Sequence, residues 1–202
     1  MLPPTWLLLS AVLLACSQLL FLSTASQPSQ IAGLSRLYHD FNGEGWIWPN
    51  TTTAGQEWVF DGNSDPCGDK WYGVNCSSSF IISLTLGGYN LSGTFSDDVF
   101  RNLTSLLVLN FAKNDIRGSL PTSLYSLRRL QTLNMTRNSI SGHISADVRY
   151  LTSLQELSLS ENLLSGEIPS SITSLGYLRS LQLMDNSFFG SIPSRIGKEK
   201  FL

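Results

Sequence analysis

The chain has 202 residues, of which 42% are hydrophobic and 14% are charged, and its formal net charge is −2. This length allows one domain, or one domain with a tail, and the charged fraction is well below the roughly 25% of an average globular protein. Since Lys and Arg are not in surplus, the composition gives no reason to expect binding to nucleic acid or to anionic lipid.

The first 26 residues have the features of a secretory signal peptide. Residues 6–22 form one apolar run, and the small residues of "STAS" follow it. We predict cleavage near Ala25 or Ser26 and therefore a secreted, extracellular protein. An apolar run of this length can also stay uncleaved as a short membrane anchor, and the sequence leaves that alternative open.

Export to the cell exterior also affects the expected oxidation state of the cysteines. Of the three in the chain, Cys16 lies in the leader, so that Cys67 and Cys76 remain after cleavage. In an oxidising compartment such a pair usually forms one disulfide. A metal site is not expected, because two cysteines without a nearby histidine provide too few ligands.

Several asparagines stand in the Asn-X-Ser/Thr pattern that accepts N-linked glycans in a eukaryotic secretory pathway. Together they predict a glycoprotein, although each single match can be accidental. The acceptors are Asn50, Asn75, Asn90, Asn102 and Asn134.

From residue 106 onward the chain repeats itself every 24 residues, and a degraded copy offset by 25 begins at Ile81. A period in this range indicates a solenoid before any other fold. Besides leucines, the four clear copies share an asparagine and a glycine, namely Asn114, Asn138, Asn162 and Asn186, and Gly118, Gly142, Gly166 and Gly190.

Each copy is interpreted as one coil of the solenoid. A short strand points two apolar residues inward, and stacked strands form a parallel sheet with a spacing of about 4.8 Å. At the bend after the strand, one asparagine per coil can satisfy backbone groups that lack a partner, because its amide both donates and accepts. We therefore predict a structural rather than catalytic ladder of these asparagines. The inward pairs are Leu109/Phe111, Leu133/Met135, Leu157/Leu159 and Leu181/Leu183.

These residues carry a resemblance to a known family. Residues 81–196 resemble the plant-type extracellular leucine-rich repeat, most clearly in "LTSLQELSLSENLLSGEIP", and "DPCGDKWYGVNC" resembles the paired-cysteine N-terminal cap of receptor-like kinases and receptor-like proteins. The resemblance implies an α/β solenoid, a right-handed superhelix with a concave parallel sheet. It further implies a helical cap closed by a Cys67–Cys76 disulfide, with Trp71 packed over the first coil.

The predicted organisation is a signal peptide at 1–26, a cap at 27–80 and five repeats at 81–202. The cap contains an amphipathic helix and then a cluster of aromatic residues, which we expect to bury the edge of the first coil, since a solenoid must be capped. An aromatic binding platform is the alternative. The helix face comprises Ile31, Leu34, Leu37, Tyr38 and Phe41, and the aromatics are Trp46, Trp48, Trp58 and Phe60.

No polar cap follows the last repeat, and Glu199 stands where earlier copies have leucine. We therefore expect the sequence to be either a truncated gene product or a fragment of a longer protein. In the receptors that the chain resembles, further repeats, a membrane helix and often a kinase domain follow. Attachment to a membrane would then come from such a segment or from an uncleaved leader.

Residues that flank the inward leucines should face the concave surface, where their types vary between copies. Such variation is what a face that binds a protein or peptide would show, and an ordinary solvated face is the alternative. A glycan on Asn134 would block macromolecular binding across the third coil. The candidate face comprises Lys113, Thr132, Arg137, Glu156, Ser158, Glu161, Arg179, Gln182, Met184 and Asp185.

Catalytic and metal-binding patterns are not found in the sequence. Asp61, Asn63 and Asp65 begin like a calcium loop, but Pro66 takes the place of the required glycine and Tyr72 that of the bidentate glutamate. Neither His39 nor His143 has the context of a catalytic triad. We therefore expect no enzymatic activity, no cofactor and no metal ion.

Two classes of function remain. The first is a recognition ectodomain that binds a protein or peptide ligand in cell-surface signalling, with a co-receptor as a further candidate partner. The second, by resemblance to polygalacturonase-inhibiting proteins, is a secreted inhibitor of a foreign hydrolase. Fold alone does not choose between them.

Overall fold

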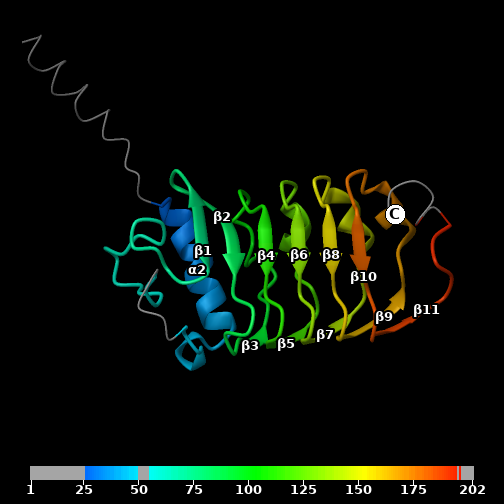
Figure 1. Ribbon diagram of the computed structural model, residues 1–202, viewed down its shortest axis with the longest axis horizontal. Helices are drawn as coiled ribbons and strands as arrows, with labels where there is room; N and C mark the ends of the chain where they lie inside the picture. Colours follow the sequence, from blue (N-terminus) through cyan, green and yellow to red (C-terminus); the bar gives the residue numbers. More distant parts are fainter. Residues whose placement is uncertain (1–25, 50–54, 195, 197–202) are drawn as a thin grey trace, which may run out of the picture.

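The computed structural model describes residues 26–49, 55–194 and 196. Nearly all of the predicted signal peptide and the acceptor Asn50 lie outside the described residues. The described chain is a row of stacked coils, with a helix and irregular loops covering the end that comes first in the sequence (Figure 1). The predicted leucine-rich-repeat solenoid is therefore confirmed.

The main sheet runs along the stack and has the strand order β1-β2-β4-β6-β8-β10. All neighbouring strands pair in parallel, except β1, which pairs antiparallel with β2. The register places Leu109 opposite Leu133 and Leu133 opposite Leu157, so the inward leucines form one continuous row. The strands are β1 (Val74–Ser77), β2 (Phe80–Thr85), β4 (Val108–Asn110), β6 (Thr132–Asn134), β8 (Glu156–Ser158) and β10 (Ser180–Gln182).

The inward pairs are buried as predicted in the first three clear copies, where each residue is at most 1% exposed. Leu181 and Leu183 are half-buried.

A second parallel sheet, which the sequence interpretation missed, follows the asparagines. Its order is β11-β9-β7-β5-β3, and it runs along the lower edge of the stack in Figure 1. Three of its strands each bury one apolar side chain completely, namely Ile116, Ile140 and Leu164. The strands are β3 (Ser92–Thr94), β5 (Asp115–Gly118), β7 (Ser139–Gly142), β9 (Leu163–Glu167) and β11 (Ser187–Phe189).

Short 3-10 helices form the remaining side of the coils: η2 (Thr122–Ser126), η3 (Ala146–Tyr150) and η4 (Ser170–Ser174). Pro121 and Pro169 precede η2 and η4, where their fixed φ angle suits the start of a helix. The helices η3 and η4 each bury one apolar side chain, Val148 and Ile172, and η2 buries Leu124 and Tyr125.

The cap consists of α2 (Pro28–Asp40), η1 (Gly43–Gly45) and the loop that leads to β1. Leu34 and Leu37 on α2 are fully buried, and Trp46, Trp58 and Trp71 are at most 5% exposed. These three tryptophans therefore offer almost no surface to a ligand, whereas Trp48 and Phe60 are half-buried, and Trp48 contacts Tyr89 of the first coil with ring centroids 6.0 Å apart. The Cys67–Cys76 disulfide ties the preceding loop to β1.

The polar interior of the stack is a ladder of asparagine side chains. The Oδ1 atom of Asn138 accepts a hydrogen bond from the Ile116 N–H group at 3.0 Å, and its Nδ2 atom donates to the carbonyls of Phe111 and Met135 at 2.9 and 3.0 Å. Equivalent sets of bonds recur at Asn114, Asn162 and Asn186. Each asparagine thus joins its own coil to the preceding one.

We predict that Asn162→Leu destabilises the protein by about 3 kcal/mol, because it leaves several buried backbone groups without partners. The midpoint of thermal unfolding should fall by about 6–12 °C, measured by circular dichroism. Asn110→Leu is the matched control, since Asn110 is half-exposed and its Oδ1 accepts only from the nearby Ala112 N–H group at 3.1 Å. Equal losses in the two variants would contradict a structural role for the ladder.

Candidate binding face

The main sheet presents the predicted binding residues on one face of coils two to five. Four of them lie on β6, β8 and β10, and four lie at the bend directly before the ladder asparagines. Arg179 precedes β10, and Met184, which is 72% exposed, follows it. The strand residues are Thr132, Glu156, Ser158 and Gln182, and the bend residues, here called the corner row, are Lys113, Arg137, Glu161 and Asp185.

The corner row has an unusual backbone. Its residues have φ angles between 54° and 60°, the left-handed region that residues other than glycine and asparagine seldom adopt. The next coil holds this backbone in place: the N–H groups of Lys113, Arg137 and Glu161 donate to carbonyls one coil further on, at 2.8, 3.0 and 2.9 Å. Because these bonds involve only main-chain atoms, the side chains of the row are free to differ.

Charge changes sign along the corner row. Lys113 and Arg137 lie on coils two and three, whereas Glu161 and Asp185 lie on coils four and five. Arg137 Nε and Glu161 Oε2 form an ion pair at 2.7 Å, with side chains 57% and 40% exposed. An exposed pair of this kind contributes at most about 1 kcal/mol to stability. Lys113 and Asp185 therefore mark the basic and acidic ends of the row.

The acceptor Asn134 lies in the middle of the face, on β6, and is half-exposed. Its Oδ1 atom accepts a hydrogen bond from the Thr136 N–H group at 3.0 Å. A glycan attaches to the amide nitrogen, so this bond does not compete with attachment. Of the other acceptors within the described residues, Asn75, Asn90 and Asn102 are exposed.

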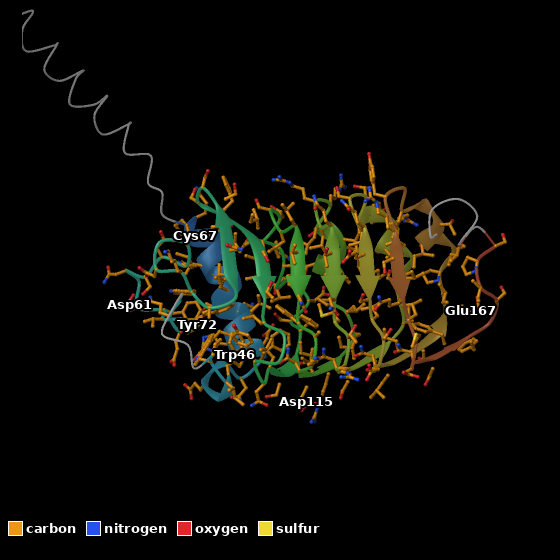
Figure 2. The ribbon with its side chains drawn as sticks, viewed as in Figure 1. Trp46, Asp61, Cys67, Tyr72, Asp115 and Glu167 are labelled. Carbon is orange, nitrogen blue, oxygen red and sulfur yellow. A yellow bond between two sulfur atoms is a disulfide. The ribbon has the colours of Figure 1, made fainter. Side chains whose placement is uncertain are left out.

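A hollow of about 500 Å³ lies where the main sheet meets the cap. Ser83 and Thr85 on β2 line one side, and Lys70 and Tyr72 of the cap line another. Tyr72 stacks on Trp48 with ring centroids 6.0 Å apart, and Figure 2 shows Tyr72 and Cys67 at this end of the stack. The concave face thus continues onto the cap.

An apolar side chain that sequence reasoning missed is Leu163 on β9, which is 60% exposed. The other copies have Asp115, Ser139 and Ser187 at this position. A position-by-position comparison of the copies would have revealed it.

The acidic residues and histidines of the described chain are dispersed over its surface loops and coils. Among the described residues, no three His, Cys, Asp or Glu side chains lie close enough to hold a metal ion. Asp61 instead organises its own loop, accepting from the N–H groups of Asn63 and Ser64 and from the Ser64 hydroxyl. These hydrogen bonds, the one from Asn63 foremost, lower the pKa of Asp61. The described part of the chain also contains no helix long and apolar enough to span a membrane.

Comparison with known proteins agrees with this geometry. The family described as "Leucine rich repeat" matches residues 83–140, and a second pattern of the same description matches residues 153–175. Protein STRUBBELIG-RECEPTOR FAMILY 3 of Arabidopsis thaliana is 40% identical over 67 residues, which are 33% of this chain and 8% of that protein. The chain thus matches less than a tenth of the length of this relative.

Solved structures are similar over more of the chain. The crystal structure of the BIR3–SERK2 complex from Arabidopsis thaliana matches with a TM-score of 0.67 and 29% identity, over 85% of this chain and 91% of the matched chain. The plant peptide hormone receptor RGFR1 in complex with RGF2 matches with a TM-score of 0.51 and 33% identity, over 53% and 17%. These features define a leucine-rich-repeat solenoid that is similar to plant receptor ectodomains. The chain belongs to the plant-type extracellular leucine-rich-repeat family.

We predict that Glu161→Gly and Glu156→Gly change stability in different ways. Glycine relieves the left-handed backbone at position 161, so this variant should be at least as stable as the parent, whereas glycine in β8 should cost about 1 kcal/mol. Urea unfolding measures both free energies, with Glu161→Ala and Glu156→Ala as controls for loss of the carboxylate. If the glycine variants lose equal stability, the corner backbone is not strained.

Proposed function

We propose that this chain is the ligand-binding ectodomain portion of a receptor-like kinase or receptor-like protein. Its concave face binds a peptide or protein at the cell surface, and the bound state is passed on as a signal. The observation that carries the proposal is the corner row, where the main chain is held by the neighbouring coil while the side chains differ in size and charge.

The comparisons support this class of function. The relative with 40% identity is named as a member of a receptor family, and the BIR3–SERK2 match is a complex of two proteins. The RGFR1 match is described as a peptide hormone receptor in complex with RGF2. A protein or peptide partner is therefore the class of ligand that the proposal adopts.

The order of charges along the corner row suggests which charges the ligand carries. Lys113 and Asp185 are three coils apart, which corresponds to about 14 Å at the spacing of stacked strands. An extended peptide covers this distance in about four residues. The proposed ligand segment therefore has an acidic residue facing Lys113 and a basic residue about four positions away, facing Asp185.

A randomised 12-residue peptide library tests this proposal. The library is selected on the secreted protein carrying Thr136→Ala, which removes the Asn134 acceptor. We expect the enriched peptides to carry opposite charges about four positions apart. Their Kd should rise roughly tenfold or more in Lys113→Glu and Asp185→Lys, because each reversal replaces an attraction by a repulsion.

Arg149→Glu on η3 is the control, because this charge reversal lies away from the main sheet. The proposal fails if the Kd of the selected peptides rises in Arg149→Glu but not in Lys113→Glu and Asp185→Lys.

A glycan on Asn134 should obstruct the same peptides. We predict that they bind the Thr136→Ala protein and the enzymatically deglycosylated parent equally well, and the glycosylated parent at least tenfold more weakly. Titration calorimetry provides the comparison. As a converse test, Ala112→Thr creates an acceptor at Asn110, the equivalent position one coil earlier, and a glycan there should also weaken binding. Tight binding to protein with full occupancy of Asn134 would exclude a ligand path across coil three.

A further inference from the structure

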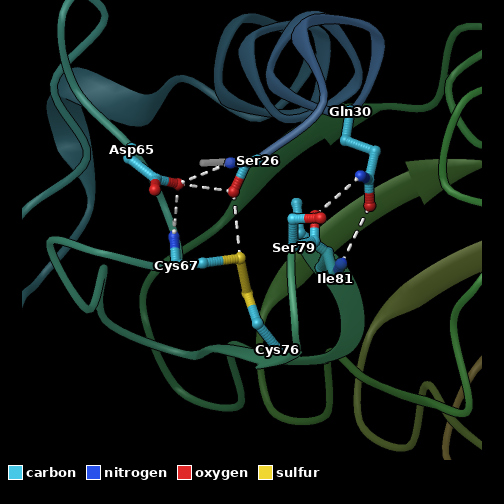
Figure 3. Close-up of a disulfide and its surroundings, with 7 residues drawn as sticks. All are labelled: Ser26, Gln30, Asp65, Cys67, Cys76, Ser79 and Ile81. Carbon is cyan, nitrogen blue, oxygen red and sulfur yellow. Dashed lines mark hydrogen bonds between the residues drawn. A yellow bond between two sulfur atoms is a disulfide. The ribbon is translucent and has the colours of Figure 1, made fainter. Parts of the chain in front are cut away.

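The first described residue, Ser26, is fixed against the disulfide loop of the cap. Its backbone N–H group donates to Asp65 Oδ1 at 3.0 Å, and its hydroxyl donates to the same oxygen at 2.6 Å. The hydroxyl also lies 2.9 Å from Cys67 Sγ, and the Cys67 N–H group donates to Asp65 Oδ1 at 3.1 Å (Figure 3). Ser26 is only 5% exposed.

Helix capping does not account for this contact. The N-cap of α2 is Gln27, whose side chain makes no capping hydrogen bond, and the first turn of the helix contains no acidic residue. Ser26 and Asp65 are instead 39 positions apart in the sequence. The contact therefore joins the segment just before α2 to the loop that the disulfide closes.

The residues before Ser26 favour proteolytic processing at one particular bond. An apolar run ends at residue 22, and Ser23 and Ala25 are the small residues at positions −3 and −1 of a cut after Ala25. We propose that the mature protein begins at Ser26, and that its new α-ammonium group forms an ion pair with the Asp65 carboxylate.

The chemistry of this step is peptide-bond hydrolysis by an endopeptidase of the secretory pathway. One water molecule is consumed: Ala25 leaves with the leader as a carboxylate, and the Ser26 nitrogen becomes an amine that takes up a proton. A neutral N–H donor is thereby replaced by a charged donor at the same position. Charge-assisted hydrogen bonds are roughly twice as strong as neutral ones.

The charges of the loop are suited to an added cation. Asp65 and Asp69 lie close together, since the Asp65 N–H group donates to Asp69 Oδ2 at 2.7 Å, and Lys70 is the next residue. Burial acts to raise the pKa of Asp65, but the hydrogen bonds from Ser26 and Cys67 outweigh it and hold this pKa below its ordinary value. Asp65 is therefore ionised at neutral pH, ready to pair with an ammonium group.

The position of Ser26 also distinguishes the two cuts that the sequence leaves open. Cleavage after Ser26 would remove both of its donors to Asp65 and leave that carboxylate partly buried with fewer partners. Cleavage after Ala25 keeps both donors and adds a positive charge.

The first test identifies the N-terminus directly. The full chain is expressed through a eukaryotic secretory pathway, and the secreted protein is dimethyl-labelled in urea and mapped by mass spectrometry. We expect the first residue to be Ser26, with a free α-amine. A first residue of Gln27, or retention of the leader, would overturn the proposal.

The second test measures the ion pair. A glutamine inserted between Ala25 and Ser26 becomes the first residue, cyclises to neutral pyroglutamate and keeps the Ser26 nitrogen as an amide. Asp65→Asn should lower the Tm of the free-amine protein by about 3 °C more than it lowers the Tm of the extended protein. Asp61→Asn, in the same loop but without contact to Ser26, should lower the Tm of the free-amine protein and of the extended protein by equal amounts. If Asp65→Asn lowers the Tm of both proteins equally, the Ser26–Asp65 ion pair is refuted.

A third measurement needs no substitution at Asp65. In the folded parent, the α-amine should react with a reductive methylation reagent at neutral pH at least tenfold more slowly than in urea-unfolded protein. Equal rates would mean that the amine is not held against Asp65. The peptide selection on the concave face does not depend on Ser26, so failure of the ion pair and failure of the proposed receptor function can be told apart.

Discussion

The stack depends on how the main chain is satisfied at the bend after each short strand. Strands of three residues provide few ladder bonds, and the bend turns carbonyl and N–H groups towards a dry interior. The amide of Asn138 serves one N–H group and one carbonyl of the preceding coil and one carbonyl of its own. Since every asparagine serves two coils, neighbouring coils stabilise one another, as is typical of repeat proteins whose stability resides in nearest-neighbour interfaces.

This arrangement separates the groups that hold the fold from those that can recognise a ligand. In coils two to five the inward leucine of the strand and the ladder asparagine are the same, whereas the corner row carries lysine, arginine, glutamate and aspartate in turn. What these four residues share is a left-handed backbone, held by bonds from main-chain atoms. Glycine or asparagine would adopt this conformation at lower cost. The left-handed backbone therefore does not account for the charges of the row, and the ion pair within it joins Arg137 and Glu161.

The sequence period was enough to predict the main sheet, the ladder and the side of the sheet on which the candidate face lies, because these follow from spacing alone. The second sheet was missed because its strands are short and end in glycine, a pattern that also fits a turn. The Arg137–Glu161 pair depends on how two side chains extend between coils, and the Ser26–Asp65 contact joins residues far apart in the sequence. Short sequence patterns therefore predict neither of these two contacts. Both emerge only when the coils and the cap are assembled in three dimensions.

The first coil depends on the cap because it lacks a ladder asparagine. Coil one has Tyr89 where the later coils have the ladder asparagine, although Asn114 of coil two still makes the usual bonds to the preceding coil, at Leu86 and Leu91. Coil one therefore has no ladder residue with which to reach back towards the cap. Aromatic packing takes over that role: Trp48 contacts both Tyr89 and Tyr72. The antiparallel strand β1 covers the free edge of β2, which would otherwise be open to pairing with another chain. Because the disulfide and Ser26 hold the same loop in place, the concave face begins at β2 on a rigid support.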